Sequence, residues 1–252
     1  MIVARELTKA YGAGIAVRDV SIEIPRGGVT SIIGPNGAGK STLLGLLSRL
    51  IPATRGSVFV DEFDVAKAPS QLLARRLSIL RQDNHIVARL TVRDLVSFGR
   101  FPHSGGRLTE EDHRRIGEAI RYLELEALAD RYLDEMSGGQ RQRAFVAMVL
   151  CQDTDYVLLD EPLNNLDMRH ATGMMKLVRR IADEMGKTFV LVLHDINFAS
   201  IYSNHIIAMR DGSLIRQGTP LEILQRHVLQ EIFEIDIPVH EIDGQRLALY
   251  YL

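Results

Sequence analysis

The chain has 252 residues, of which 46% are hydrophobic and 25% charged, and its formal net charge is −2 at pH 7. This composition is ordinary for a globular α/β protein that can bury a sizeable core. The near-neutral charge gives no bulk attraction to nucleic acid, and no apolar run approaches the ~18–20 residues of a membrane span. A single cysteine excludes an internal disulfide and a cysteine-based metal cluster, and it suits a reducing compartment.

The first predicted element is an antiparallel hairpin. Polar and apolar residues alternate over Ile2–Leu7 and again over Val17–Ile24, and Gly12 and Gly14 lie between the two runs. The residues from Pro25 to Gly28 are expected to end the second strand.

A phosphate loop of the pattern G-x-x-x-x-G-K-S follows the apolar run 29–33. In this motif backbone N–H groups wrap the β-phosphate, Lys40 reaches the β/γ oxygens, and Ser41 offers a hydroxyl to Mg²⁺. The helix expected from Ser41 directs its positive dipole end at the anion. The sequence therefore predicts a nucleoside triphosphate site made by Gly34, Pro35, Asn36, Gly37, Ala38, Gly39, Lys40, Ser41 and Thr42.

Strands and helical stretches alternate in the rest of the chain. Strands are predicted at 29–33, 77–80, 156–159 and 189–193, which is typical of a mostly parallel, covered sheet. Between Gln82 and Ser137 the pattern is helical, with apolar stripes that begin at Val92 and Ile116. Within this block Phe101–Leu108 is predicted to be a loop rich in proline and glycine.

A second anion site is predicted where Ser137, Gly138, Gly139 and Gln140 precede another apolar helical stripe. One triphosphate does not need two such sites from one chain. Each nucleotide is therefore expected to lie between two copies of the chain in a two-fold dimer.

Two carboxylates follow the apolar strand 156–159. Asp160 stands at the strand end, where it can coordinate Mg²⁺, and Glu161 can accept a hydrogen bond from the attacking water as base or water positioner. The alternative is an acidic strand end that caps a helix before Pro162. The phosphate loop earlier in the chain favours the catalytic interpretation.

Six features in order resemble the nucleotide-binding subunit of ABC transporters: Tyr11, the phosphate loop, Gln82, Ser137–Gln140, Tyr156–Glu161 and His194. The resemblance implies an α/β fold with an ABC-type P-loop ATPase core, a mostly parallel sheet, an N-terminal antiparallel β subdomain and a helical signature subdomain. It also implies a single domain over 1–252, with the helical subdomain inserted at about 83–150 and a short tail at about 220–252.

The resemblance assigns roles to single residues, with ATP and Mg²⁺ as cofactors. His194 would hydrogen-bond the γ-phosphate, and Gln82 would ligate Mg²⁺ while joining the core to the helical block. Tyr11 would stack on adenine, the alternative being a tyrosine packed on the hairpin. Catalysis is thus assigned to Glu161, His194, Lys40 and Gln82, metal binding to Ser41, Gln82 and Asp160, and further nucleotide contacts to Tyr11, Asp167 and, in the partner copy, Ser137–Gln140.

The transported substrate is inferred from a departure from the family pattern. Asn164 and Asn165 stand where most of the superfamily has Ser or Thr followed by Ala. Together with His194–Ala199 and Gln217–Pro220, this variant resembles ATPases of bacterial ferric-siderophore importers. Haem and cobalamin importers are close relatives, and a non-transport ABC ATPase of DNA repair or translation is the remaining alternative.

The implied partners are a second copy of the chain, transmembrane permease subunits and, indirectly, a substrate-binding protein, but no nucleic acid, and the implied location is the cytoplasmic face of the membrane. A permease helix is expected to bind in a groove lined by part of the apolar set Ile86, Val87, Leu90, Val92, Leu95, Val96, Phe98 and Phe101, whose other members pack the helical block. The tail is expected to hold an amphipathic stretch, Leu221–Phe233, and a hairpin turning at Asp243-Gly244.

Overall fold

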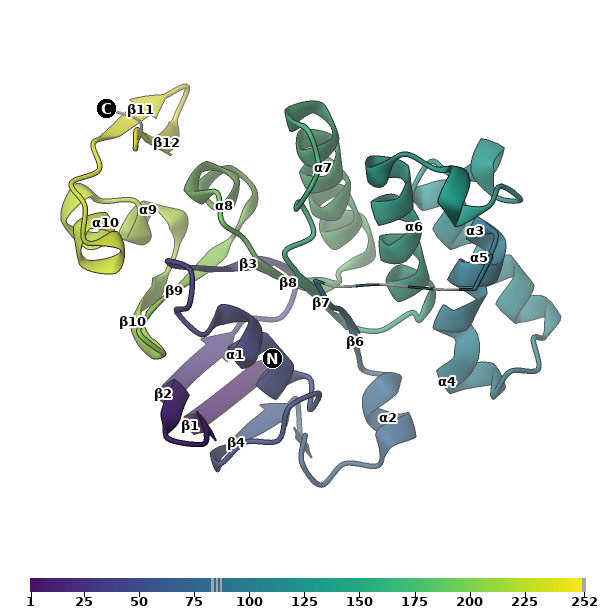
Figure 1. Cartoon of the computed structure of the whole chain (residues 1–252), viewed down its shortest axis with the longest axis horizontal. Helices are drawn as coiled ribbons and strands as arrows, with labels where there is room; N and C mark the ends of the chain where they lie inside the picture. The colour runs from purple at the N-terminus through teal and green to yellow at the C-terminus, as the bar shows by residue number, and fades with distance from the viewer. Residues whose placement is uncertain (83, 85, 87, 251–252) are drawn as a thin grey trace. The chain divides into compact units, whose positions relative to one another are not determined.

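The computed structural model describes residues 1–82, 84, 86 and 88–250 (Figure 1). It divides the chain into two compact units. The first unit consists of Met1–Ala68 and Val178–Leu252, and the second of Pro69–Leu177. The predicted helical block at 83–150 lies within the second unit. Within the described part of the chain, no helix combines the length and apolarity needed to cross a bilayer.

An antiparallel sheet opens the first unit. Its strands, in the order β2-β1-β4-β5, are β1 (Ile2–Tyr11), β2 (Gly14–Ile24), β4 (Arg55–Val60) and β5 (Phe63–Asp64). The pairing runs from Ile2 opposite Ile24 to Tyr11 opposite Gly14, which confirms the predicted hairpin. Alternate residues of β2 are buried because one face of this sheet covers the core.

The strands of the second sheet in this unit are largely parallel. They are β3 (Gly28–Ile33), β8 (Thr188–Val192), β9 (His205–Arg210) and β10 (Ser213–Gly218). Strand β3 runs parallel to both β8 and β9, and β10 returns antiparallel along β9. Residues 29–33 of β3 and all residues of β8 are buried without alternation, as expected for strands covered on both faces. The predicted strands at 29–33 and 189–193 are confirmed to within one residue.

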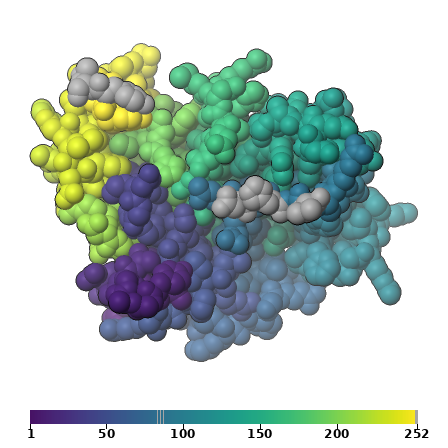
Figure 2. Space-filling view, in the orientation of Figure 1, coloured from purple at the N-terminus to yellow at the C-terminus, as the bar shows by residue number. Residues whose placement is uncertain are grey.

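Short helices and a tail complete the first unit. Its helices are α1 (Lys40–Leu47), α8 (Ile196–Tyr202), α9 (Pro220–Ile223) and α10 (Arg226–Phe233), and α7 (Met168–Met185) spans the boundary between the units. The predicted stretch Leu221–Phe233 is thus two helices, because the chain leaves helical geometry at Leu224. The predicted terminal hairpin is present as β11 (Val239–Ile242) and β12 (Gln245–Ala248). Figure 2 shows this tail, in yellow, at the surface.

The second unit combines one parallel strand pair with helices. Strand β6 (Leu77–Leu80) runs parallel to β7 (Tyr156–Asp160), which confirms two further predicted strands. The helices are α2 (Ser70–Ala74), α3 (Val92–Ser97), α4 (Phe101–Ser104), α5 (Glu110–Tyr122) and α6 (Gly138–Cys151), with 3-10 turns at Phe98–Arg100, Glu126–Leu128 and Leu133–Glu135. The apolar stripes that begin at Val92 and Ile116 are buried, as their spacing predicts.

Two predicted boundaries are wrong. The first four residues of the predicted loop Phe101–Leu108 form helix α4, because Pro102 fits the first turn of a helix and Gly105, at φ 58°, ends it. Helix α1 begins at Lys40 rather than Ser41, so the lysine belongs to its first turn.

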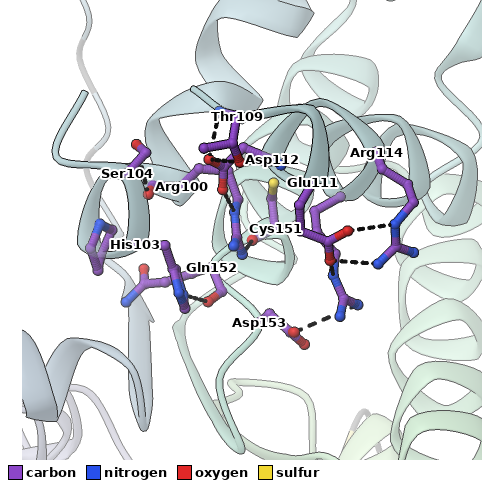
Figure 3. Close-up of polar contacts among 12 residues, drawn as sticks. Arg100, His103, Ser104, Thr109, Glu111, Asp112, Arg114, Cys151, Gln152 and Asp153 are labelled. Atoms are coloured by element: carbon purple, nitrogen blue, oxygen red, sulfur yellow. Dashed lines mark hydrogen bonds and ion pairs between the residues drawn. The ribbon is translucent and has the colours of Figure 1, made fainter. Parts of the chain in front are cut away.

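A buried ion pair joins three parts of the second unit (Figure 3). The Arg100 Nε donates to Asp112 Oδ1 at 2.8 Å, and the exposed fractions of the two side chains are 7% and 5%. The same guanidinium donates to the carbonyl oxygen of Cys151 at 2.9 Å, and Asp112 accepts hydrogen bonds from the backbone and hydroxyl of Thr109. Arg100 therefore connects the N-terminus of α5 with the C-terminus of α6.

Cys151 lies in the core beside this pair. Its side chain is buried, and burial raises the pKa of the thiol to about 12. The cysteine is thus a structural residue rather than a nucleophile or a metal ligand.

Candidate functional site

The phosphate loop connects β3 to α1 in the first unit. Its conformation requires glycine at two positions because other backbone segments approach closely. A Cβ on Gly34 would lie 2.0 Å from the carbonyl oxygen of Met209, and one on Gly39 would lie 2.3 Å from that of Ala16. Both glycines have positive φ, at 144° and 91°. At Gly39, packing against β2 is therefore a reason for glycine in addition to the access to phosphate that the motif predicts.

Lys40 is buried and its ammonium is held by the loop itself. Its Nζ donates to the carbonyl oxygens of Gly34 and Pro35, both at 2.9 Å. The cation thus lies within the curve of the loop, at the N-terminus of α1, where the helix dipole is positive. A buried ammonium and a helix N-terminus together favour a highly charged anion such as a polyphosphate.

His194 lies at the same edge of the sheet as the phosphate loop. Ile32 of β3 lies opposite Val192 of β8 in a parallel pair, so Gly34 and His194 both follow the carboxyl ends of neighbouring strands. The pairing continues one residue further, since the Leu193 N–H donates to the carbonyl oxygen of Ile32 at 3.1 Å. The His194 side chain is exposed.

Asp195 fixes the direction of the chain after His194. Its Oδ1 accepts hydrogen bonds from the N–H groups of Asn197 at 2.7 Å and Phe198 at 3.2 Å, which caps helix α8. Asn197 in turn exchanges two hydrogen bonds with the backbone of Ala248 on β12. Asp195 is therefore connected to the C-terminal hairpin through its hydrogen bond with Asn197 in the first turn of α8.

Tyr11 ends β1 and its side chain is 53% exposed. The ring lies outside the buried core of the hairpin, and the Lys9 ammonium lies 4.9 Å from the ring centroid. An exposed aromatic face next to a cation suits stacking against a planar, negatively charged ligand.

In the second unit, Gln82 and Asp160 lie at the same edge of the parallel pair β6–β7. Leu80 lies opposite Leu159. Asp160 is the last residue of β7, and Gln82 follows the end of β6 after Arg81. The hydroxyl, amide and carboxylate oxygens of Ser41, Gln82 and Asp160 are ligands of the kind that Mg²⁺ prefers. Among the described residues, no three His, Cys, Asp or Glu side chains gather as a metal site.

Glu161 follows Asp160 with a backbone conformation unusual for a residue with a side chain. Its φ is +50°, in the left-handed region, and such strain is concentrated at functional sites. The Glu161 Oε2 accepts a hydrogen bond from the amide nitrogen of Asn164, a contact that the motif comparison does not predict.

The segment Ser137–Gln140 forms the start of helix α6. The Gln140 N–H donates to Ser137 Oγ at 3.3 Å and the Ser137 N–H donates to Gln140 Oε1 at 3.1 Å, which is a complete capping box. This gives Ser137 and Gln140 a structural role within their own chain. The S-x-x-Q spacing that signals such a cap is present in the sequence.

Asp167 is bonded to His170, a residue that belongs to none of the predicted motifs. Its Oδ1 lies 2.8 Å from both the backbone nitrogen and the ring Nδ1 of His170. These hydrogen bonds, the backbone bond first, hold the pKa of the Asp167 carboxyl below its usual value. The carboxylate is therefore ionised and oriented at neutral pH.

The predicted site residues are distributed over the two units. The first unit carries Tyr11, the phosphate loop and His194, and the second carries Gln82, Asp160, Glu161, Ser137–Gln140 and Asp167. Sequence motifs identified each of these positions, whereas Asn164 and His170 as contacts of Glu161 and Asp167 are visible only in the structure.

Comparison with known proteins identifies the family of the chain. Residues 17–164 match the family model described as ABC transporter. The chain is 51% identical to the petrobactin import ATP-binding protein YclP of Bacillus subtilis (strain 168), with 100% of both chains covered, and 53% identical to the petrobactin import ATP-binding protein FatE of Bacillus anthracis, with 99% of this chain and 100% of the relative covered.

A solved structure of similar fold is a dimeric ATP-binding cassette in a post-hydrolysis state with ADP and Pi, at a TM-score of 0.78 and 30% identity, covering 87% of this chain and 99% of that one. The α/β fold of an ABC-type ATPase, predicted from the six motifs, is thereby confirmed. The chain belongs to the ABC transporter family, within which it is an ATPase.

Proposed function

We propose that this chain hydrolyses ATP to power the import of a ferric siderophore through a membrane permease. The observation that carries the proposal is the phosphate loop with its buried Lys40, held by two loop carbonyls at the N-terminus of α1. The choice of siderophore is supported by the similarity to YclP and FatE, both petrobactin import ATP-binding proteins that match essentially the whole chain.

The phosphate-binding residues act mainly by charge and by backbone donors. Lys40 neutralises the β/γ-phosphates, and the loop N–H groups bind their oxygens. Ser41, Gln82 and Asp160 would hold Mg²⁺, which when bound neutralises further phosphate charge. Tyr11 would stack on the adenine ring and orient the nucleotide from its other end.

The hydrolytic residues act on water and the γ-phosphate. Glu161 accepts the hydrogen bond of the attacking water and acts as its base or positioner. His194 donates to the γ-phosphate and restricts the position of the same water.

We also propose that ATP is held between two copies of the chain. Ser137, Gly138 and Gly139 at the N-terminus of α6, with Gln140 and Asp167, would act on the nucleotide of the partner. Support comes from the second helix N-terminus rich in small residues and from the dimeric solved cassette.

The permease is proposed to bind the second unit near the start of α4. Of the apolar set predicted for this contact, Val92, Leu95 and Val96 are buried and pack the unit, whereas Phe98 and Phe101 are 53% and 65% exposed. Val87 lies outside the described residues. Two exposed phenylalanines three positions apart form a patch suited to a short helix of a permease loop. Such a complex would keep the chain at the cytoplasmic face of the membrane.

Uptake measurements test the transport proposal. Deletion of the gene is expected to abolish uptake of radioiron-labelled ferric petrobactin, and the wild-type chain but not Glu161→Gln is expected to restore it. Normal petrobactin uptake in the deletion strain would contradict the substrate assignment, and parallel assays with haem and cobalamin would then identify the related importers. Copurification with ribosomes or DNA instead of a polytopic membrane protein would contradict the transport role itself.

A further inference from the structure

The loop after Glu161 is closed by two hydrogen bonds between the same two residues. The Asn164 side-chain amide donates to Glu161 Oε2, and the Asn164 backbone N–H donates to the Glu161 carbonyl oxygen at 3.2 Å. Both residues are half-buried and both lie in the second unit. Asn164 therefore holds the backbone and the carboxylate of Glu161 at once.

The side-chain bond restricts the rotation of the Glu161 side chain. A glutamate side chain has three rotatable bonds, and ordering it costs conformational entropy. A donor fixed to one carboxylate oxygen removes most of that freedom, while the carboxylate keeps acceptor capacity for other partners. The chemistry of Asn164 is suited to this, because its amide NH₂ only donates and cannot compete for the proton of a water.

The neighbouring asparagine has a separate explanation. Asn165 has φ +60°, a left-handed conformation that asparagine tolerates better than most residues with a side chain. The two departures from the common family pattern thus have different causes. Asn165 suits the left-handed backbone conformation at its position, whereas the Asn164 side chain donates a hydrogen bond to the carboxylate of Glu161.

We propose that Asn164 is a positioning residue for hydrolysis, which holds the Glu161 carboxylate in its working orientation. The proposal rests on the proposed role of Glu161 in activating water. Asn164 has no role in binding ATP within this scheme, so its loss should change turnover and leave the apparent affinity for ATP unchanged.

A double-mutant cycle on the full-length chain tests the proposal. Asn164→Ala is expected to lower kcat about 10-fold with KM for ATP within 2-fold of wild type, the size expected for losing one hydrogen bond to a charged group. In the Glu161→Gln background the same substitution is expected to change residual turnover by less than about 2-fold, because the group that it positions is gone. Asn165→Gly, which removes an adjacent amide and suits the left-handed backbone, is the matched control and should keep kcat near wild type.

The outcomes separate this proposal from the function on which it rests. Equal losses of kcat in both backgrounds, a change confined to KM, or wild-type kcat in Asn164→Ala would each overturn the positioning role. Wild-type turnover of Glu161→Gln would instead remove Glu161 from the mechanism. Thermal unfolding of each variant identifies a loss caused by misfolding, and in that case Asn164→Asp with Glu161→Gln, which keeps the hydrogen bond with donor and acceptor exchanged, is expected to recover the melting temperature but not kcat.

Discussion

The imidazole of His170 occupies the space into which a side chain on Gly139 would extend: a Cβ added to Gly139 would lie 2.9 Å from His170 Cδ2 and 3.0 Å from Cγ. The ring cannot yield freely, because Asp167 binds it through Nδ1 and binds its backbone as well. The segment Ser137–Gln140 and the loop that contains Asp167 are therefore packed against each other through a glycine and a histidine of the same chain.

Because of this contact, a side chain at position 139 should lower the stability of the fold. Gly139→Ala is expected to lower the free energy of unfolding by about 1–3 kcal/mol through overpacking, and His170→Ala in the same chain is expected to restore most of it. Gly138→Ala is the matched control, since its nearest contact would be 3.9 Å away at the Asn165 carbonyl oxygen. Urea unfolding of the four proteins measures the effect. A loss at Gly139 that the histidine substitution fails to relieve would contradict the packing explanation.

Acid stability should depend on Asp112. Hydrogen bonds from Thr109, then Arg100, lower the pKa of the Asp112 carboxyl from 3.8 to about 2. The folded pKa lies below the unfolded one, so the stabilisation is fully present above pH ~4 and is lost as the pH falls towards about 2. The wild type should therefore lose stability more steeply than Asp112→Asn over this interval.

At neutral pH the same substitution should be costly. Asp112→Asn leaves the buried Arg100 without its counter-charge, which is expected to cost about 3–5 kcal/mol. Glu111→Gln is a useful control because the pKa of Glu111 is also lowered to about 2, by Arg114 first, but this pair is exposed and should contribute little to stability. Equal unfolding midpoints for the two variants at pH 7 would show that burial of the Arg100 pair does not matter.

Nucleotide binding should depend on Lys40. Lys40→Ala removes the cation held within the phosphate loop and is expected to abolish ATP binding. Titration with a fluorescent ATP analogue measures this, with Lys67→Ala as control because Lys67 is exposed and paired with Asp64. Unchanged ATP affinity in Lys40→Ala would contradict the assignment of the loop.

The proposed dimer can be tested by mixing two defective subunits. Ser137→Arg should leave ATP binding intact and prevent closure on the partner, and the lost helix cap should cost about 1 kcal/mol of stability. Mixed with Lys40→Ala subunits, it yields heterodimers in which one composite site has both defects and the other has neither. Recovery of ATP-dependent dimerisation or hydrolysis on mixing is expected, and no recovery at any ratio would argue against sites shared between subunits.

Coupling to the permease should depend on the exposed phenylalanines. Phe98→Glu and Phe101→Glu are expected to reduce siderophore uptake several-fold while ATPase activity of the isolated chain persists, because the altered patch lies at the surface. Leu221→Glu, at a 58% exposed apolar position of the tail, is the control. Wild-type uptake by both phenylalanine variants would remove this patch from the proposed interface.

Local patterns predicted most of what positions the site. The phosphate loop, the strand before Asp160 and the hairpin ahead of Tyr11 all depend on residues adjacent in the chain, and these were confirmed as elements of the fold. Strands β9 and β10 were not predicted, and a local apolar run does not show which distant strand lies beside it. The requirement for glycine at position 34 depends on such a distant contact, because the carbonyl oxygen of Met209 on β9 excludes a side chain there.

Contacts between side chains were the least predictable part of the site. Asn164 departs visibly from the family pattern, but only the turn geometry brings its amide to Glu161. His170 was one of eight histidines in the sequence, and no local signal separates it from the others. Its bond to Asp167 and its contact with Gly139 depend on how the start of α7 folds against α6.

Because Cys151 is buried, it need not be replaced before a cysteine is introduced elsewhere for site-specific labelling. It is the chain's one cysteine, and at neutral pH a thiol with a pKa of about 12 has almost no thiolate to react with maleimides. A cysteine introduced at a surface position would therefore be the sole reactive thiol without any change to the native core. Distances between labels on two copies, or cross-links from Phe98→Cys to a permease, can thus be measured in an otherwise wild-type ATPase.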